Sequence, residues 1–397
     1  MNKKLLTAAI GAALAAGPML AGTAVADVKL YGRVHVSVDF VNQEGPGNGT
    51  TTTTTESSSR KQTHVSSNAS RWGIDVSEKL GGGTTAIAKL EQAVYADGED
   101  ATQTSHARWV GLSGKFGQVT AGIHESQFKL IGRAVDLFPE YIGDARNITA
   151  MGAPAAAQPA YNADNNGSIG WEQRPANSIQ YVTPAFGGFR FAYLYSADTT
   201  ASTTIEDNRR RMDDVAVTYT GGPLYVGLSY QTHRYPGGIT ASATANTADG
   251  NPVEKGYRLG ASYNFGAFKV VGLYQDLKDL GATRDGASAV NRKAWGLGGA
   301  YTAGNEVFKL QYYKAGKLSN FSAGTSGDNT GATMWALGWD HLFSKTAKVY
   351  VAYAKTDNES NARFLVNGPA QNARSDWAQP ATGKDPSAWS VGMVVDF

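Results

Sequence analysis

The chain has 397 residues, of which 36 are lysine or arginine and 34 are aspartate or glutamate, and it contains no cysteine. The nearly neutral charge argues against a nucleic-acid-binding protein, and the lack of cysteine excludes disulfide cross-links. Glycine (47 residues) and tyrosine (19 residues) are abundant, which is typical of many short strands joined by tight turns.

The N-terminal segment has the features of a secretory signal peptide. Two lysines at positions 3 and 4 precede an uncharged run, which ends in the small-residue sequence Ala24-Val25-Ala26. We therefore predict that residues 1–26 are a signal peptide, whose removal takes away two lysines and leaves 34 basic against 34 acidic residues. No later segment approaches 18 consecutive apolar residues, so no transmembrane helix is predicted.

The first segment of the mature chain alternates in polarity at almost every residue. From Val28 to Phe40 (VKLYGRVHVSVDF), valine, leucine and phenylalanine occupy the even positions, and lysine, arginine, histidine and aspartate lie among the odd ones. Successive side chains of a strand point to opposite faces, so this pattern predicts a strand with one apolar and one polar face. The apolar face of such a strand contacts either a protein core or lipid.

Alternating segments recur along the whole mature chain. Sixteen strands are predicted, at residues 27–41, 69–79, 84–96, 104–114, 117–126, 173–184, 188–198, 211–221, 223–235, 254–265, 267–278, 291–302, 306–317, 330–342, 346–357 and 387–397.

The lengths of the connections favour a membrane barrel over a soluble sheet. Seven connections are very short and rich in glycine or proline, and they alternate strictly with eight longer polar ones. Short turns on one side and long loops on the other are typical of outer-membrane barrels. We predict an all-β fold for residues 27–397: a sixteen-stranded antiparallel transmembrane β-barrel with lipid outside and an aqueous interior. The low-complexity segment from Thr50 to Lys61 is expected to be a mobile external loop, and the long apolar segment 127–172 is expected to pack against something.

Six motifs resemble those of a known family, the general porins of Gram-negative outer membranes, in its beta- and gammaproteobacterial form. They are LYGRV at 30–34, SRWGIDVSEKLGGG at 70–83, RWVGLSGKFGQVTAG at 108–122, DLFPEYIGD at 136–144, NSIQYVTPAFGGF at 177–189 and the terminal VGMVVDF. The resemblance implies a homotrimeric channel for passive diffusion of small hydrophilic solutes and ions, in contact with outer-membrane lipid and lipopolysaccharide. It also implies a third external loop, residues 127–172, that folds inward, and it implies no enzymatic activity, cofactor or nucleic-acid partner.

The same resemblance assigns the residues of a pore constriction. Its acids are Asp136, Glu140 and Asp144 of the inward loop, and its facing bases are Arg33, Arg71, Arg108 and Arg174. Strand parity supports Arg33, Arg71 and Arg108 independently, because each lies out of phase with an apolar row. Other residues of lumen-facing parity are Lys89, Glu91, Gln180 and Arg190.

The sign of the ionic selectivity stays open from the sequence. The family often has an arginine at the end of the fifth strand, where this chain has Ile123 and His124, and the inward loop carries Lys129, Arg133 and Arg146 of its own. A solute-specific channel of the same architecture is the alternative, since aromatic residues also occur at lumen-facing positions. The six histidines show no metal-ligand spacing, so no metal site is predicted.

Overall fold

The computed structural model describes residues 26–44, 59–98, 105–140, 142–149, 171–197, 211–234, 253–280, 290–319, 327–366 and 383–397. The predicted signal peptide lies almost wholly outside these ranges. The elements are strands β1 (Asp27–Glu44), β2 (Ser59–Ser67), β3 (Arg71–Gly81), β4 (Thr84–Ala93), β5 (Ser105–Gly114) and β6 (Gly117–Ile123), helices α2 (Gln127–Ala134) and α3 (Arg146–Thr149), and strands β7 (Ser178–Val182), β8 (Phe189–Ala197), β9 (Arg211–Gly221), β10 (Leu224–Arg234), β11 (Val253–Phe265), β12 (Phe268–Leu280), β13 (Val290–Ala303), β14 (Glu306–Ala315), β15 (Ala332–Leu342), β16 (Ala347–Asn358) and β17 (Ser387–Asp396).

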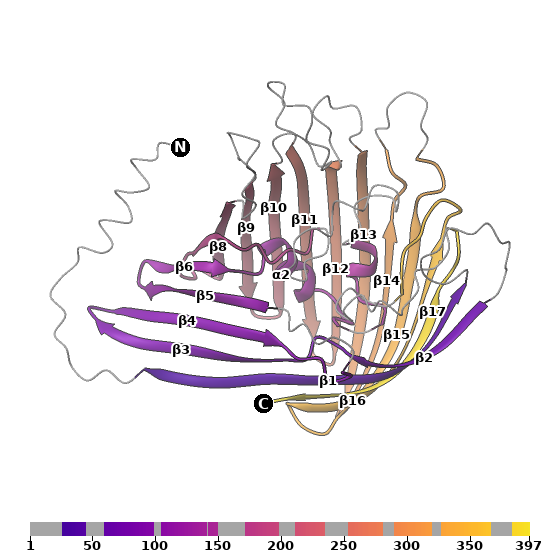
Figure 1. Ribbon diagram of the computed structural model, residues 1–397, viewed down its shortest axis with the longest axis horizontal. Helices are drawn as coiled ribbons and strands as arrows, with labels where there is room; N and C mark the ends of the chain where they lie inside the picture. Colours follow the sequence, from indigo (N-terminus) through magenta and orange to yellow (C-terminus); the bar gives the residue numbers. More distant parts are fainter. Residues whose placement is uncertain are drawn as a thin grey trace.

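The strands form one closed antiparallel barrel (Figure 1). Consecutive strands from β3 to β17 pair side by side, and β17 returns to pair with β1, from Arg33↔Asp396 to Asn42↔Ser387. Strands β2 and β3 pair with successive parts of the long strand β1, so together they occupy one position in the circuit. The barrel is therefore sixteen-stranded, which confirms the predicted fold.

Strand β2 was not predicted. The sequence analysis assigned its residues to the loop before the second strand, because Ser59–Ser67 (SRKQTHVSS) is polar and lacks an apolar row. The chain is extended there because β1 offers it a full row of hydrogen-bonding partners, and Ala69, at a φ of 52°, marks the break between β2 and β3. The expected mobile loop from Thr50 to Lys61 thus ends in strand, and its residues 50–58 lie outside the described ranges.

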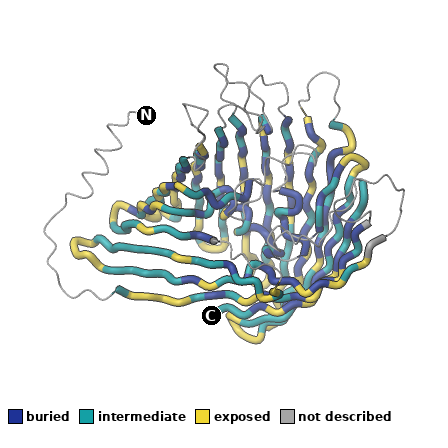
Figure 2. The backbone as a smooth tube through the Cα atoms, in the orientation of Figure 1, coloured by how far each residue is buried: buried dark blue, intermediate teal, exposed yellow. Residues whose placement is uncertain are grey.

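The alternation of β1 sorts its side chains between the outside and the inside of the barrel. Val34 is 45% exposed on the outer face, whereas its neighbour His35 is 1% exposed on the inner face. The same alternation runs along the other strands (Figure 2). At the chain end, the ring of Phe397 lies over Gly32 on the outer face, so that a Cβ at this glycine would lie 2.3 Å from the ring. Along β1, the outer face is therefore apolar and the inner face polar, as expected for a barrel in lipid.

The connections divide by length between the two ends of the barrel. The seven short turns, such as Gly222-Pro223 and Gly304-Asn305, join strands at one end, and the strand ends that the longer connections join lie at the other (Figure 1). Within the described ranges, no helix has the length and apolar character needed to cross a membrane. One of the longer connections, between β6 and β7, enters the barrel and carries both helices.

Candidate functional site

The loop between β6 and β7 is seated on the inner wall of the barrel. Helix α2 begins after Ser126, whose side-chain oxygen accepts a hydrogen bond from the amide of Lys129. Its residue Ile131 packs over two wall glycines: a Cβ at Gly227 or Gly260 would lie 2.8 Å or 2.9 Å from Ile131. The absence of side chains at these wall positions makes room for the helix.

The next turn of the loop packs over β14, β15 and β16 in the same way. The ring of Phe138 lies over Gly338, where a Cβ would be 2.6 Å from it, and Gly143 lies against Ala336 and Ala354. Phe138, Ile142 and Ile148 belong to the larger of the two buried apolar clusters in the part of the chain that the structure describes. The core of this barrel therefore lies between the loop and one side of its wall, while the inner faces of β3 and β4 stay partly exposed (Figure 2).

Asp136 fastens the loop to the wall. Its carboxylate accepts hydrogen bonds from the amides of Phe138 (2.8 Å) and Ala145 (3.0 Å) and from the side-chain amide of Gln311 on β14 (3.0 Å). Gln311 also donates to the carbonyl of Gly143 at 2.8 Å. Asp136 is thus buried against the wall, and it has no contact with the predicted basic residues among the described interactions.

Asp144 organises the loop in a similar way. Its carboxylate accepts hydrogen bonds from the amide of Glu140 (2.8 Å) and from the amide and side chain of Arg146 (2.8 Å and 2.6 Å). The expectation that Asp136 and Asp144 face the pore therefore differs from their position. Backbone amides hold both carboxylates, with Gln311 of the wall on Asp136 and Arg146 on Asp144. Of the three predicted acids, Glu140 meets the predicted arginines.

The ionisation of Asp136 should make the docking of the loop depend on pH. Burial, together with the negative charge of Asp144, raises the pKa of Asp136 to about 7. The docked loop therefore favours protonated Asp136. The contribution of this protonation to the stability of the docked loop is fully present below the ordinary pKa of aspartate and is lost as the pH rises through about 7. We expect open-channel current noise to increase between pH 5 and pH 8. Replacing Asp136 with asparagine should remove that increase, and an unchanged pH dependence in this variant would contradict the assignment.

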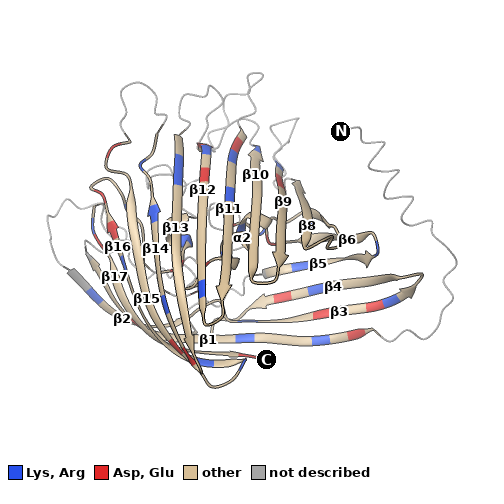
Figure 3. Ribbon diagram, turned by 180° about the vertical axis from the view of Figure 1, so that it is seen from behind, with Lys and Arg blue, Asp and Glu red and all other residues tan. Residues whose placement is uncertain are grey.

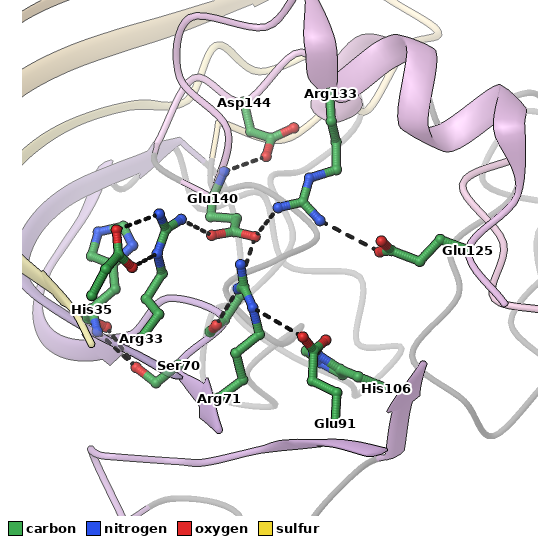
Figure 4. Close-up of polar contacts among 12 residues, drawn as sticks. Arg33, His35, Ser70, Arg71, Glu91, His106, Glu125, Arg133, Glu140 and Asp144 are labelled. Atoms are coloured by element: carbon green, nitrogen blue, oxygen red, sulfur yellow. Dashed lines mark hydrogen bonds and ion pairs between the residues drawn. The ribbon is translucent and has the colours of Figure 1, made fainter. Parts of the chain in front are cut away.

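Three arginines surround the carboxylate of Glu140 (Figure 4). Arg33 on β1 approaches it at 3.0 Å, Arg71 on β3 at 3.2 Å, and Arg133 of the loop itself at 2.6 Å. The residue has a φ of 69°, a left-handed conformation that turns its side chain toward this wall. Arg33 and Arg71 also contact Asp396 (2.6 Å) and Glu91 (3.7 Å), respectively.

The electrostatics of this cluster favour a carboxylate that stays ionised. Burial alone would raise the pKa of Glu140, but the positive charges of Arg133, Arg71 and Arg33 hold it well below its usual range. The Glu140 side chain is 3% exposed, whereas Arg33, Arg71 and Arg133 are 28%, 16% and 24% exposed. Immediately around Glu140, the charge that faces water is therefore mostly positive, and the exposed acid beside it is Asp396, which is 37% exposed and pairs with Arg33.

A second carboxylate, Glu125, extends the cluster along the loop. It contacts Lys129 at 3.1 Å, Arg174 at 3.2 Å and Arg133 at 3.4 Å, so Arg133 bridges the two acids. Burial opposes ionisation of Glu125, but these three cations lower its pKa well below the ordinary value. Burial and the charge of Arg174 lower the pKa of Lys129 to about 7. Arg174, predicted as a constriction base, is therefore part of the cluster through Glu125 and not through Glu140.

Comparison with known proteins identifies the family. The sequence profile of the family described as Gram-negative porin matches residues 8–361. The chain is a Gram-negative porin. It is 30% identical over 379 residues to outer membrane porin protein 32 of Delftia acidovorans, with 93% of each chain covered. It is 27% identical over 395 residues to major outer membrane protein P.IA of Neisseria meningitidis serogroup C, covering 89% of this chain and 93% of that protein.

Solved structures agree with this assignment. The anion-selective porin from Comamonas acidovorans is 25% identical and superposes with a TM-score of 0.70, covering 94% of this chain and all of that one (100%). OmpT of Vibrio cholerae, in its trimer form, shares the fold at 15% identity and a TM-score of 0.62, covering 94% of this chain and 100% of its own. The porin therefore belongs in the outer membrane of a Gram-negative bacterium.

Arg108 of the porin lies on the outer face, contrary to the prediction. The register pairs it with Leu90, and directly paired residues share a face; Leu90 is 53% exposed on the outside. The parity argument failed because it took Trp109 as the outward apolar residue, whereas Arg108 shares the parity of Val110, which is 61% exposed on the outer face. Trp109 stacks on His124 inside the barrel.

The remaining predicted residues share the inner face. Lys89 contacts Asp75 at 2.7 Å and lies over the ring of Tyr31, while Glu91 accepts hydrogen bonds from Tyr31 and pairs with His106. Two other predicted residues, Gln180 and Arg190, have the parity of buried inward residues such as Ser178 and Leu194. Across the described ranges, no three side chains among histidine, aspartate and glutamate gather as metal ligands would.

Three residues of the porin cluster lie outside the predicted constriction set. In the prediction Arg133 is only one of the cations of the inward loop, and Glu125 and Asp396 have no role. A signal existed for the first two, because Glu125, Lys129 and Arg133 are spaced by four residues on and beside a helix. Asp396 carried no such signal, since its partner Arg33 is 363 residues away in the sequence.

Proposed function

We propose that this porin is an open aqueous channel for passive diffusion of small hydrophilic solutes, and that it prefers anions. The observation that carries the preference is the burial of Glu140 behind Arg33, Arg71 and Arg133, which exposes guanidinium groups and hides the carboxylate. Charged groups that line a pore select ions of the opposite sign. The similarity to a porin described as anion-selective supports the same sign.

The reversal potential in a salt gradient tests the proposal. In planar bilayers with a potassium chloride gradient, we expect the current through the wild-type porin to reverse at a potential shifted from zero toward the equilibrium potential of chloride. Replacing Glu140 with glutamine removes the one carboxylate that the three arginines share, so anion preference should increase. Asparagine at Asp136 is the matched control, because this acid faces the wall and should leave the reversal potential unchanged.

Two outcomes would contradict the proposal. A wild-type reversal potential on the potassium side would reject the anion preference, while the channel itself would stand. An equal shift for the Asp136 and Glu140 variants would show that the loop as a whole, and not the Glu140 cluster, sets the selectivity.

We also propose that the porin assembles as a homotrimer and contacts outer-membrane lipid and lipopolysaccharide through its apolar outer face. A channel without catalytic activity fits the porin family. The trimer is supported by OmpT of Vibrio cholerae, which has a trimer form and the same fold. Native mass spectrometry in mild detergent should show a complex of three chains.

A further inference from the structure

The outer wall of β12 to β17 contains an apolar groove of about 820 Å³. Its floor is at Gly299, which stands between Val270 and Leu310 in a row of larger side chains. A Cβ built at Gly299 would approach the carbonyl oxygen of Lys269 at 3.9 Å and no other atom within 4 Å. The groove is therefore a gap that a missing side chain leaves on the face that lies in lipid.

Aromatic residues border both ends of the groove. Phe268, Tyr301, Phe308 and Trp339 lie toward the short turns, and Trp335, Tyr353 and Trp389 lie toward the long loops. Tyrosine and tryptophan concentrate at the two membrane interfaces in such barrels. The groove therefore extends between the two interfaces, which suits the length of an acyl chain.

Two exposed lysines lie just beyond the end of the groove toward the long loops. Lys314 on β14 lies opposite Trp295 and Thr333, and Lys293 lies two residues before Trp295 on the neighbouring strand β13. Both point outward (Figure 3 shows the basic positions near the upper ends of these strands). In this arrangement their side chains are diagonal neighbours on one face, about 7–8 Å apart at the backbone.

These two lysines differ from three other lysines of the rim. Lys255 pairs with Asp279 at 3.1 Å, Lys278 with Asp276 at 3.7 Å, and Lys355 with Asp357. Asp276 lies opposite Lys293 in the register, but its ion pair is with Lys278. Within the described ranges, neither Lys293 nor Lys314 has an ion-pair partner.

We propose that the groove binds one phosphate-bearing lipid of the outer leaflet, with an acyl chain against Gly299 and the phosphate on Lys293 and Lys314. This inference rests on the proposed contact with outer-membrane lipid and names a site for it. A lipid matches both parts of the surface, since it joins an apolar chain to an anionic head group. A second copy of the chain would have to cover the two lysines with acids of its own while also filling the groove.

The test uses the full-length porin with hexa-acylated lipid A that carries two phosphates. Native mass spectrometry measures the number of retained lipids for the wild type and for two variants. Glutamine at both Lys293 and Lys314 should weaken retention about 30-fold, because each lysine near a membrane surface contributes about 1 kcal/mol to the binding of anionic lipid. Phenylalanine at Gly299 should fill the groove without a clash and weaken retention about tenfold.

The matched control is glutamine at both Lys255 and Lys278, which removes two rim lysines that already have acidic partners. Retention equal to the wild type in this control, with loss in the other variants, supports the site. Equal losses in all three variants, or no loss in the Gly299 variant, would overturn it. Displacement of lipid A by millimolar inorganic phosphate would also overturn it, because the groove would then add nothing.

Two further measurements separate this inference from the alternatives. Loss of the trimer in the Gly299 or lysine variants, with lipid retention unchanged, would assign the groove to a contact between subunits instead. The reversal potential should stay the same in every variant, because all of these residues are outside the channel. The lipid site can therefore fail while the proposed anion preference holds, and the reverse is also true.

Discussion

Replacing Arg33 and Arg71 together with glutamine is expected to lower the chloride-to-potassium permeability ratio about tenfold. A unit charge about 6 Å from a passing ion changes the energy of that ion by about 0.7 kcal/mol in water, and salt screening reduces this by about half. Because the effect has opposite signs for chloride and potassium, two charges change their ratio by about one order of magnitude. Arg133 stays in place and still pairs with Glu140 at 2.6 Å, so the carboxylate keeps a partner and the loop should stay docked. Planar-bilayer reversal potentials provide the measurement.

Two single-arginine variants serve as controls for this experiment. Arg108 has the same charge, but it lies on the outer face beside Leu90, so Arg108→Gln should leave the reversal potential unchanged. Arg190 is exposed, has inward parity and lies outside the Glu140 cluster, so Arg190→Gln should have a small effect. A shift for Arg108→Gln as large as that for the double variant would show that net charge, and not the position of the arginines, controls selectivity.

Replacing Phe138 with alanine should detach the loop from the wall and enlarge the channel. The ring is fully buried over Gly338, and Lys309 lies 4.7 Å from its centre. Truncating a buried phenylalanine costs about 3–5 kcal/mol, which is enough to undo local docking while the barrel itself keeps its strand pairing. We expect a larger mean unitary conductance and a wider spread of values than in the wild type.

The control for this variant is Phe343→Ala on an exposed turn between β15 and β16. Its side chain is 59% exposed, so its removal should leave the unitary conductance unchanged. A single sharp conductance of wild-type size for Phe138→Ala would contradict this expectation. It would mean that the contacts of Asp136 and Gln311 hold the loop without the packing of the Phe138 ring on Gly338.

Much of the barrel could be predicted from local patterns in the sequence. Alternation such as that from Val28 to Phe40 depends on the two-residue period of a strand, which every residue of the strand obeys. The short turns carry their own signal as well, because Gly222 and Gly304 adopt positive φ values that favour glycine. These features are local, so a single chain was enough to indicate sixteen strands, short turns at one end and an apolar exterior.

The errors occurred where a partner strand decides the outcome. β2 has no apolar row of its own and is extended because β1 pairs with it. Arg108 stands next to Trp109 and two residues before Val110, so parity in its own segment allows either face. Its pairing with Leu90, which is 53% exposed on the outer face, decides the side.

The sequence by itself determined the sixteen positions of the barrel, the two faces of most strands and the loop that carries the predicted constriction acids. Only the tertiary structure decided which acid meets the arginines, since Glu140 contacts side chains from β1, from β3 and from its own loop. It also decided that Asp136 and Asp144 hold the loop in its conformation, because their carboxylates accept hydrogen bonds from backbone amides of the loop. The physical reason is the same in each case: alternation depends on neighbouring residues, whereas the charge that faces the channel depends on distant segments brought together by closure of the barrel.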